Sequence, residues 1–471
     1  MKIAVLGTGP SSIQALNTLL TESRFPQDLE VHIFDFNHSA ADAYKFKHKS
    51  LKKGIEDYSL EVPSTLNFQI NSENDVWGSF AQGGWSNVWG ATLYENNEDY
   101  FYRFDPTTLP SALAGFYVGE EKSRRLPNFI KGKRLGGDFS ISNSKKNLQL
   151  LPSPLAIRPI SDNPEKGCIQ CAKCLEGCPY GHIWNANFVL NRFKTMQNIK
   201  ITKAFVDTLE IIGNQVRVNL ISNSNKSSFV FDLVICGLGA IQTAALLIKS
   251  HIVKNSIYIR DSQMITVPFT FKRLKSTGNY DERIALSEAT ISSAIQFSSV
   301  KGDYFSQLYG YSKSLDKVFC ESVPLLRLIP PFIRRLFLSR FGIAMIFLSE
   351  ELSGSIEIRM DGRSVNQISH TNSLQLNSVC KEIQKDFSAH YLNLITGLKK
   401  INSVGGGFHF GNIFSNLGTQ FDTLTGELAP NSNLLIVDSS ALPRISSRPI
   451  TIQVMRNAER IVRNFMLRMG L

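Results

Sequence analysis

Two glycines near the start of the chain are spaced for contact with a phosphate group. Gly7 and Gly9 lie between an apolar run at residues 2–6 and an amphipathic segment. Gly7 permits a tight turn, and Gly9 allows backbone amides to approach a pyrophosphate at a helix N-terminus, where the helix dipole favours negative charge. Ser12 replaces the third glycine of the usual pattern and is small enough for close packing. Asp35 ends the next apolar run, where an acid can bind ribose hydroxyls, so the sequence predicts a dinucleotide site.

A second segment of small residues follows at 80–94, with the sequence FAQGGWSNVWGATLY. Gly83 and Gly84 permit the backbone to approach a phosphate or a ring. Trp85 and Trp89 could pack against a flat cofactor. By composition alone, the segment also fits an ordinary tight loop.

Cysteines fill four of the eleven positions from Cys168 to Cys178, with Cys171 and Cys174 between them. The spacing Cys-x2-Cys-x2-Cys-x3-Cys-Pro matches that of bacterial ferredoxins, in which thiolates converge on an iron–sulfur cluster. We therefore expect such a cluster, with four or three irons, and the alternatives are zinc or cysteines without a metal. The candidates for a fourth cluster ligand are Cys178, Cys236, Cys320 and Cys380.

The elements that position these residues follow an α/β pattern. Residues 2–36 predict a strand, a helix and a second strand. Residues 231–240 predict another buried strand before a helix, and the segments 257–272 and 290–298 are β-like. The last part of the chain, from residue 433, predicts a strand, a loop and a long helix.

The chain of 471 residues carries 51 Lys and Arg against 40 Asp and Glu, a formal net charge of +11. This balance favours anionic partners such as phosphorylated substrates, nucleotides or an acidic membrane surface, and no motif indicates nucleic-acid binding. We find no export signal and no apolar run of about 18 residues. Seven clustered cysteines then indicate reduced thiols or metal ligands. We expect a cytoplasmic protein, or one attached peripherally to a membrane.

The most apolar stretch, residues 324–348, is punctuated by Arg327, Arg334, Arg335 and Arg340. Its two prolines must break any helix, and a new helix could begin just after them. One interpretation is a surface helix that dips into a membrane. The other is a buried helix whose arginines extend to the surface.

Four blocks together resemble the glucose–methanol–choline (GMC) family of flavoprotein oxidoreductases. They are residues 5–12, 83–90, 232–247 and 433–461. The last block, NLLIVDSSALPRISSRPITIQVMRNAERI, resembles the C-terminal signature of that family, and LVICGLGAIQTAALL resembles its later FAD-domain strand and helix. The resemblance implies tightly bound FAD.

It also implies an FAD-binding Rossmann-type domain and a discontinuous α+β substrate domain built on an antiparallel sheet. The FAD-binding parts would be 1–100, 166–265 (with the cysteine run) and 401–471, and the substrate parts 101–165 and 266–400. The residues implied at the cofactor are small or polar: Gly7, Gly9, Pro10, Ser11, Ser12, Asp35, Gly83, Gly84, Ser86, Asn87, Asp438, Ser439 and Pro449.

Enzymes of this family move a hydride from an alcohol carbon to the flavin, while a nearby base takes the hydroxyl proton. His409, in GGGFHFGN at 405–412, lies where the family keeps its active-site histidine. Histidine suits this role because its pKa lies near neutrality. The alternative is a loop histidine with a structural hydrogen bond.

Arg448 departs from the family pattern, which usually has Asn or His directly before this proline of the signature. Arginine cannot act as a base at working pH. Its fixed charge could stabilise anionic reduced flavin, or bind a carboxylate or phosphate of the substrate.

The expected function is FAD-dependent oxidation of an alcohol to a carbonyl compound. A sugar or sugar derivative is the first substrate expectation, and a sterol-like or long-chain alcohol at a membrane surface is the second. Electrons would leave through the iron–sulfur cluster to a quinone or a redox protein. The alternatives are a non-catalytic flavoprotein subunit, because of Arg448, and a reductase that saturates a double bond.

Overall fold

The computed structural model describes most of the chain. The described residues are 1–24, 26–36, 70–72, 82–87, 89–94, 109–117, 149–171, 173–174, 178–222, 225–253, 256–271, 286–297, 300–312, 316, 320, 324–338, 341–361, 364–370, 373–389, 392–402, 404, 409–411, 413, 425–428 and 432–471. Arg340 and the three glycines at 405–407 therefore lie outside the described residues.

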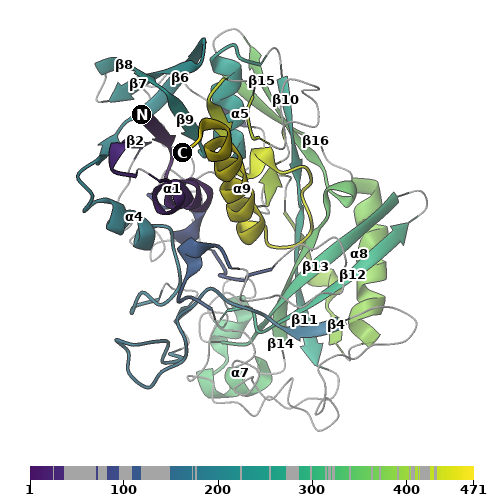
Figure 1. The fold of residues 1–471 in the computed structure, drawn as a ribbon. Coiled ribbons are helices and arrows are strands. Elements are labelled where there is room, and N and C mark those ends of the chain that lie inside the picture. The colour runs from purple at the N-terminus through teal and green to yellow at the C-terminus, as the bar shows by residue number, and fades with distance from the viewer. Residues whose placement is uncertain are drawn as a thin grey trace.

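A parallel sheet forms the first layer of the molecule (Figure 1). Its strands lie in the order β20 (Leu434–Ile436), β9 (Leu233–Cys236), β1 (Lys2–Leu6), β2 (Glu30–Asp35) and β5 (Ile199–Lys203). The inner strands are short apolar runs, as expected for strands that are covered on both faces. The predicted Rossmann-type unit is confirmed.

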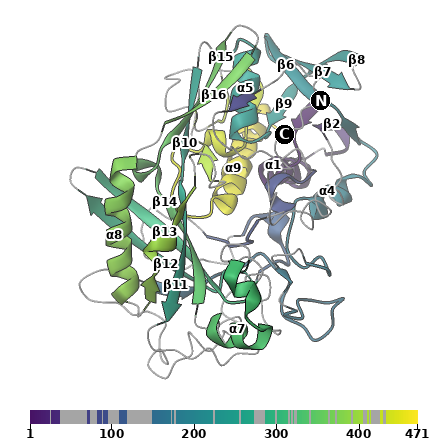
Figure 2. The same ribbon diagram turned by 180° about the vertical axis from the view of Figure 1, so that it is seen from behind.

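Helices cover this sheet on both faces. They are α1 (Pro10–Glu22), α4 (Asn187–Phe193), α5 (Ala240–Lys249) and α9 (Thr451–Met469). Helices α1 and α9 come from opposite ends of the chain and pack side by side in both views (Figures 1 and 2). Their apolar faces share one core with the strands, so the two ends of the sequence stabilise each other.

An antiparallel meander leads into β9. It consists of β6 (Phe205–Ile212), β7 (Gln215–Ser222) and β8 (Asn225–Phe231). It places the start of β6 beside the end of β2, so Phe36 and Phe205 meet edge to face with their ring centres 6.4 Å apart.

A larger antiparallel sheet forms the substrate side of the molecule. Its path is β17 (Leu392–Leu394), β11 (Met264–Phe271), β14 (Phe341–Leu348), β13 (Val300–Gly310), β12 (Ala289–Phe297) and β4 (Gln149–Pro152), with β18 (Lys400–Ile401) beside β11. Helix α8 (Ser373–Ala389) covers one face. Since side chains alternate along a strand, Tyr304 and Leu308 of β13 pack under α8, and Phe305, Gln307 and Tyr309 lie on the opposite face.

A further sheet has five strands. Its order is β19 (Phe410–Gly411), β10 (Ser256–Asp261), β15 (Ser355–Asp361), β16 (Ser364–His370) and β3 (Ile70–Ser72). The predicted β-like segments at 257–272 and 290–298 are thus strands, and the predicted fold class is confirmed. The proposed domain boundaries stay a prediction.

The apolar stretch 324–348 does not form one helix. It divides into the 3-10 helix η7 (Pro324–Leu328), helix α7 (Pro331–Leu338) and strand β14. The residues FGIAMIFL become a strand because β11 and β13 flank them on both edges and bury most of their side chains. The short 3-10 helices elsewhere are η1 (Pro26–Asp28), η3 (Gly84–Asn87), η5 (Ser111–Leu113), η8 (Glu350–Leu352), η9 (Thr396–Leu398) and η12 (Ser439–Ala441).

No helix among the described residues combines the length and the apolar character needed to cross a bilayer.

Candidate active site

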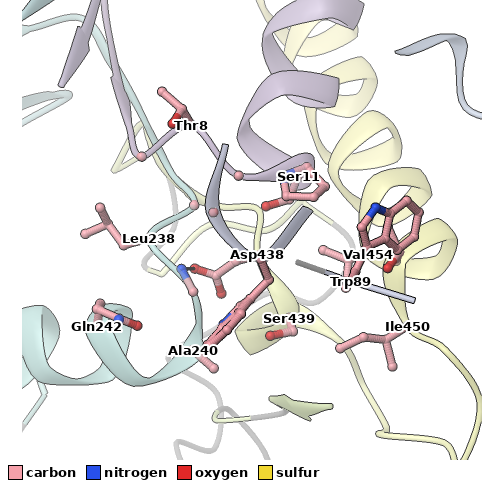
Figure 3. A pocket seen from close by; sticks show the side chains of 18 of the residues that line it. Thr8, Ser11, Trp89, Leu238, Ala240, Gln242, Asp438, Ser439, Ile450 and Val454 are labelled. Atoms are coloured by element: carbon pink, nitrogen blue, oxygen red, sulfur yellow. Dashed lines mark hydrogen bonds between the residues drawn. The ribbon is translucent and has the colours of Figure 1, made fainter. Parts of the chain in front are cut away.

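A cavity of about 270 Å³ opens at the carboxyl ends of the parallel strands. The turns after β1, β2, β9 and β20 line one part of it, and His409 and Gln307 line another. Figure 3 shows Asp438 and Ser439 among side chains that come from both ends of the chain. Parallel sheets bind their ligands at this edge, so the position agrees with the predicted dinucleotide site.

The turn between β1 and α1 is built for close approach by a ligand. Gly7 has a φ of +84°, and a Cβ atom there would lie 2.8 Å from the carbonyl oxygen of Gly237. A Cβ atom on Gly9 would meet no atom within 4 Å, so this residue faces open space. Gly9, Pro10 and Ser11 all line the cavity, and the first turn of α1 contains no acidic residue. The turn therefore offers backbone amides and a favourable helix dipole to a phosphate.

Ser12 has a packing role in this structure. Its hydroxyl donates to the carbonyl oxygen of Gly237 at 3.1 Å, and the side chain is fully buried. A Cβ atom on Gly237 would lie 2.1 Å from this hydroxyl oxygen. Ser12 thus holds α1 close to the turn after β9 and does not line the cavity.

Asp35 lines the cavity at the end of β2, as the sequence predicts. Its carboxylate accepts a hydrogen bond of 2.5 Å from the Thr8 hydroxyl, whose oxygen in turn accepts from the Gly83 amide at 2.8 Å. Sequence reasoning passed over Thr8, although its position between two glycines places it in the turn. This chain of hydrogen bonds joins β2, the phosphate turn and the loop at 82–87.

The loop at 82–87 contributes less to the cavity than expected. Gly84 and Trp85 line it, and a Cβ atom on Gly84 would lie 3.4 Å from the Gly9 Cα. Ser86 instead donates to the Gly83 carbonyl at 2.6 Å, and the Asn87 amide donates to the Gly84 carbonyl at 2.9 Å. Gly83, Ser86 and Asn87 therefore shape the loop, and none of these three lines the cavity.

Asp438 connects the C-terminal loop to the turn before α5. Its carboxylate accepts from the Gly239 amide at 2.9 Å, from the Thr243 hydroxyl at 2.6 Å and from the Ser440 amide at 2.8 Å. Burial raises the pKa of this carboxyl, and the hydrogen bonds oppose that shift. Asp438, Ser439 and Pro449 all line the cavity.

His409 lines the far part of the same cavity. Its ring stacks on Phe347 with ring centres 4.5 Å apart, and its carbonyl accepts a 2.8 Å hydrogen bond from the Ser262 amide. Nδ1 is buried and has no hydrogen-bond partner among the described residues. Burial lowers the pKa of His409 to about 4. The imidazole is therefore neutral at physiological pH and can accept a proton.

Gln307 also lines the cavity and was not predicted. The Tyr309 hydroxyl donates to its Oε1 at 2.7 Å. This bond orients the side chain, so that its amide NH₂ group is the end left for a ligand. No local motif marks Gln307, because only its place on β13 directs it toward the cavity.

The chain matches no protein-family model and, in sequence, no curated protein. Among solved structures it is similar to pyridoxine 4-oxidase from Mesorbium loti, with a TM-score of 0.54 at 12% identity over 99% of both chains. It is also similar to a formate oxidase, with a TM-score of 0.56 at 12% identity over 99% of this chain and 98% of that one. A variant of the Aspergillus oryzae formate oxidase, studied for its FAD modification, gives a TM-score of 0.53 at 11% identity, with coverage of 99% and 98%.

The chain has the fold of these oxidases. The fold that the GMC resemblance implied is therefore confirmed. At such low identities the argument for an activity must come from the site residues.

Within this GMC-type fold, Arg448 is buried and does not line the cavity. Its guanidinium carbon lies 4.4 Å from the centre of the Tyr94 ring. The neighbouring Ser447 hydroxyl donates to Asp303 at 2.5 Å, and Asp303 attracts Arg448 electrostatically. The structure thus places Arg448 next to an aromatic ring and a buried acid, and its catalytic role stays a prediction.

The described part of the cysteine run gives no support to a metal site. Among the described residues, no group of three or more His, Cys, Asp or Glu side chains lies close enough to hold a metal ion. Cys168 pairs with Ile160 in a short parallel bridge, and the Cys178 sulfur accepts a hydrogen bond from the His182 amide at 3.2 Å. The geometry does not support the expected iron–sulfur cluster, and zinc has no better support.

Proposed function

We propose that the chain is an FAD-dependent oxidoreductase that oxidises an alcohol to a carbonyl compound. The observation that carries the proposal is one continuous cavity that joins the glycine turn of α1 to the neutral imidazole of His409. The site fits FAD because Gly9 faces open space at a helix N-terminus and Asp35 stands at the end of β2. The related folds belong to oxidases, one of them studied for its FAD modification.

The chain's own residues hold the cofactor and handle the proton. Gly9, Ser11 and the amides of the first turn of α1 bind the pyrophosphate, and Asp35 binds the ribose. Phe36 and Phe205 border the adenosine end of the cavity. When bound, FAD supplies an acceptor for the hydride that leaves the carbinol carbon.

His409 removes the hydroxyl proton through Nε2, since Nδ1 is enclosed by protein. The electron pair of the broken O–H bond forms the carbonyl double bond as the hydride departs, so the alcohol loses two electrons in one step. Gln307 donates its amide NH₂ group to the substrate oxygen and keeps the hydroxyl near His409. The electron acceptor of the overall reaction is a quinone, a redox protein or oxygen.

An apolar alcohol has a specific observation in its favour. Apolar side chains such as Trp89, Ile450 and Val454 line the cavity. Outside the lining, Phe347 stacks on His409 and belongs to a buried cluster with Tyr94, Met264 and Phe305. A sterol-like or long-chain alcohol suits such surroundings better than a sugar, which would need many polar partners.

The test is anaerobic reduction of bound flavin. The purified chain is loaded with FAD and mixed with a long-chain alcohol, a sterol or a hexose, and the visible absorbance of the flavin is followed. We expect bleaching with at least one alcohol, fastest with an apolar one. A chain that binds FAD but is bleached by no alcohol would contradict the proposal. Bleaching by the hexose alone would contradict only the substrate class.

The pH dependence of this reaction follows from the burial of His409. Its pKa of about 4 lies below the ordinary value for histidine, so the proton-accepting form persists well into the acid range. We expect kcat/KM for the alcohol to stay level down to about pH 5 and to fall below that. The measurement is a pH profile with the FAD-loaded enzyme. An acid limb centred near the ordinary histidine value would show that His409 is more exposed in the working enzyme.

Removal of the Tyr309 hydroxyl should weaken substrate orientation without loss of the cofactor. In Tyr309→Phe the Gln307 amide loses the bond that fixes its rotation. We expect kcat/KM to fall by roughly tenfold, as for the loss of one neutral hydrogen bond, with FAD binding unchanged. Tyr304→Phe is a suitable control, because its hydroxyl bonds Asp386 on the α8 face of the same strand. Equal losses in both variants would indicate a general effect on the sheet.

A further inference from the structure

The segment 324–338 presents its apolar side chains to solvent. The exposed fractions are 80% for Leu328, 76% for Leu336 and 73% for Phe332, and Leu325, Ile333 and Phe337 are exposed as well. Single exposed apolar residues are common on protein surfaces, but six within one short segment mark an interaction site. We call this surface the α7 face, defined by these six residues. It lies at the foot of the molecule in both views, far from the chain termini (Figures 1 and 2).

In helix α7 apolar side chains face the solvent and a charged side chain faces inward, the reverse of the usual arrangement in a surface helix. Its charged Arg334 turns inward and forms a two-pronged ion pair with Asp316, at 2.8 Å and 2.7 Å. The same guanidinium donates to the carbonyl oxygens of Leu326 and Ile329. These bonds fix the helix so that the apolar side chains of the α7 face cannot turn inward.

The base of the segment is anchored on the substrate sheet. Leu338 is buried with Tyr309, Tyr311 and Ile343, and Leu326 packs against the same cluster. The α7 face is therefore a supported surface of a packed structure. Tyr309 belongs to this cluster and also bonds Gln307, which lines the cavity.

The positive charge of the segment favours a partner with a negatively charged surface. Residues 324–338 contain three arginines and no acidic residue, and the whole chain has a formal charge of +11. Arg334 pairs with Asp316, and Arg327 and Arg335 are exposed among the apolar side chains. Arg327 Nε also donates to the Cys320 carbonyl at 3.0 Å. Exposed leucine and phenylalanine together with arginine are the composition of a helix that lies in the interface of an anionic bilayer. Two copies of this face would oppose arginine to arginine, which disfavours a self-association site.

We propose that the α7 face docks the protein on the surface of an anionic phospholipid bilayer. The six apolar side chains enter the headgroup region, and Arg327 and Arg335 contact lipid phosphates. This inference stands on exposure and charge alone and holds whatever the substrate proves to be.

Co-sedimentation with vesicles tests the proposal. The FAD-loaded full chain is incubated with vesicles of phosphatidylcholine alone or of phosphatidylcholine with phosphatidylglycerol. The double variant Leu328→Gln/Leu336→Gln should bind the anionic vesicles about a hundredfold more weakly, since each buried leucine contributes about tenfold. The matched control is Leu467→Gln, because Leu467 is 81% exposed on α9, outside the α7 face. Both variants change only exposed side chains, and their flavin spectra and alcohol turnover should match those of the unaltered protein.

Three results would overturn the proposal. The unaltered protein binds neither kind of vesicle, or the double variant binds as well as the control, or the protein is a dimer that the double variant dissociates. The last result, seen by sedimentation equilibrium without lipid, would assign the α7 face to a second copy of the chain. None of these outcomes bears on the chemistry at His409.

Discussion

Replacement of His409 by alanine should lower alcohol-dependent flavin reduction by about 10²- to 10⁴-fold, the usual contribution of a positioned general base. FAD binding should persist, because the proposed cofactor contacts come from the turn at Gly7 and Gly9 and from Asp35, and not from His409. The measurement is single-turnover reduction of the flavin by saturating alcohol, beside a titration of the cofactor. The loss should appear in kcat, since the proton moves only as the alcohol reacts.

His370→Ala is the matched control. This histidine lies on β16 beside Glu357, outside the cavity lining, and is largely exposed. It should retain full activity. If His409→Ala also retained full activity in a protein that oxidises alcohols, another group would be the base. If neither the variant nor the unaltered protein showed turnover, the alternative of a non-catalytic flavoprotein subunit would gain support.

The second large effect is expected from Gly7→Ala. The new Cβ atom would lie 2.8 Å from the Gly237 carbonyl oxygen, and the φ of +84° is strained for alanine. Relief of that contact must move the turn that approaches the pyrophosphate. We expect FAD to bind at least tenfold more weakly, as measured by the change of flavin fluorescence on titration, with about 1–3 kcal/mol lost from the free energy of unfolding.

Gly213→Ala separates strain from ligand contact. Gly213 has a φ of +60° in the hairpin between β6 and β7, and a Cβ atom there would meet no atom within 4 Å. This variant carries similar backbone strain far from the cofactor and should bind FAD normally. Equal weakening of FAD binding in the two variants would show that the turn at Gly7 has no special part in the site.

The sequence was most informative where the structure depends on neighbours along the chain. The unit from β1 to β2 forms locally, so its apolar runs and glycine spacing were sufficient to predict the fold and the place of Gly9 and Asp35 in the cavity. His409 was predicted because it precedes the C-terminal block of the resemblance, at the place where the family keeps its active-site histidine. Gln307 was missed because the pairing of β13 with β12 and β14 decides which of its side chains reach the cavity.

Two expectations failed to match the structure for related reasons. Cysteine spacing describes distances along the chain, whereas a cluster needs convergence in space, and the described residues show no such group. The apolar composition of residues 341–348 fits a buried helix as well as a buried strand. Pairing with the flanking strands β11 and β13 makes this segment a strand.

The position of β20 at the edge of the parallel sheet has a consequence for biosynthesis. Until residues 434–436 have left the ribosome, β9 remains an uncovered edge strand made of the residues LVIC. An apolar edge of this kind readily pairs with other chains. Translation of the segment that carries β20 therefore allows this edge to be covered by its native partner.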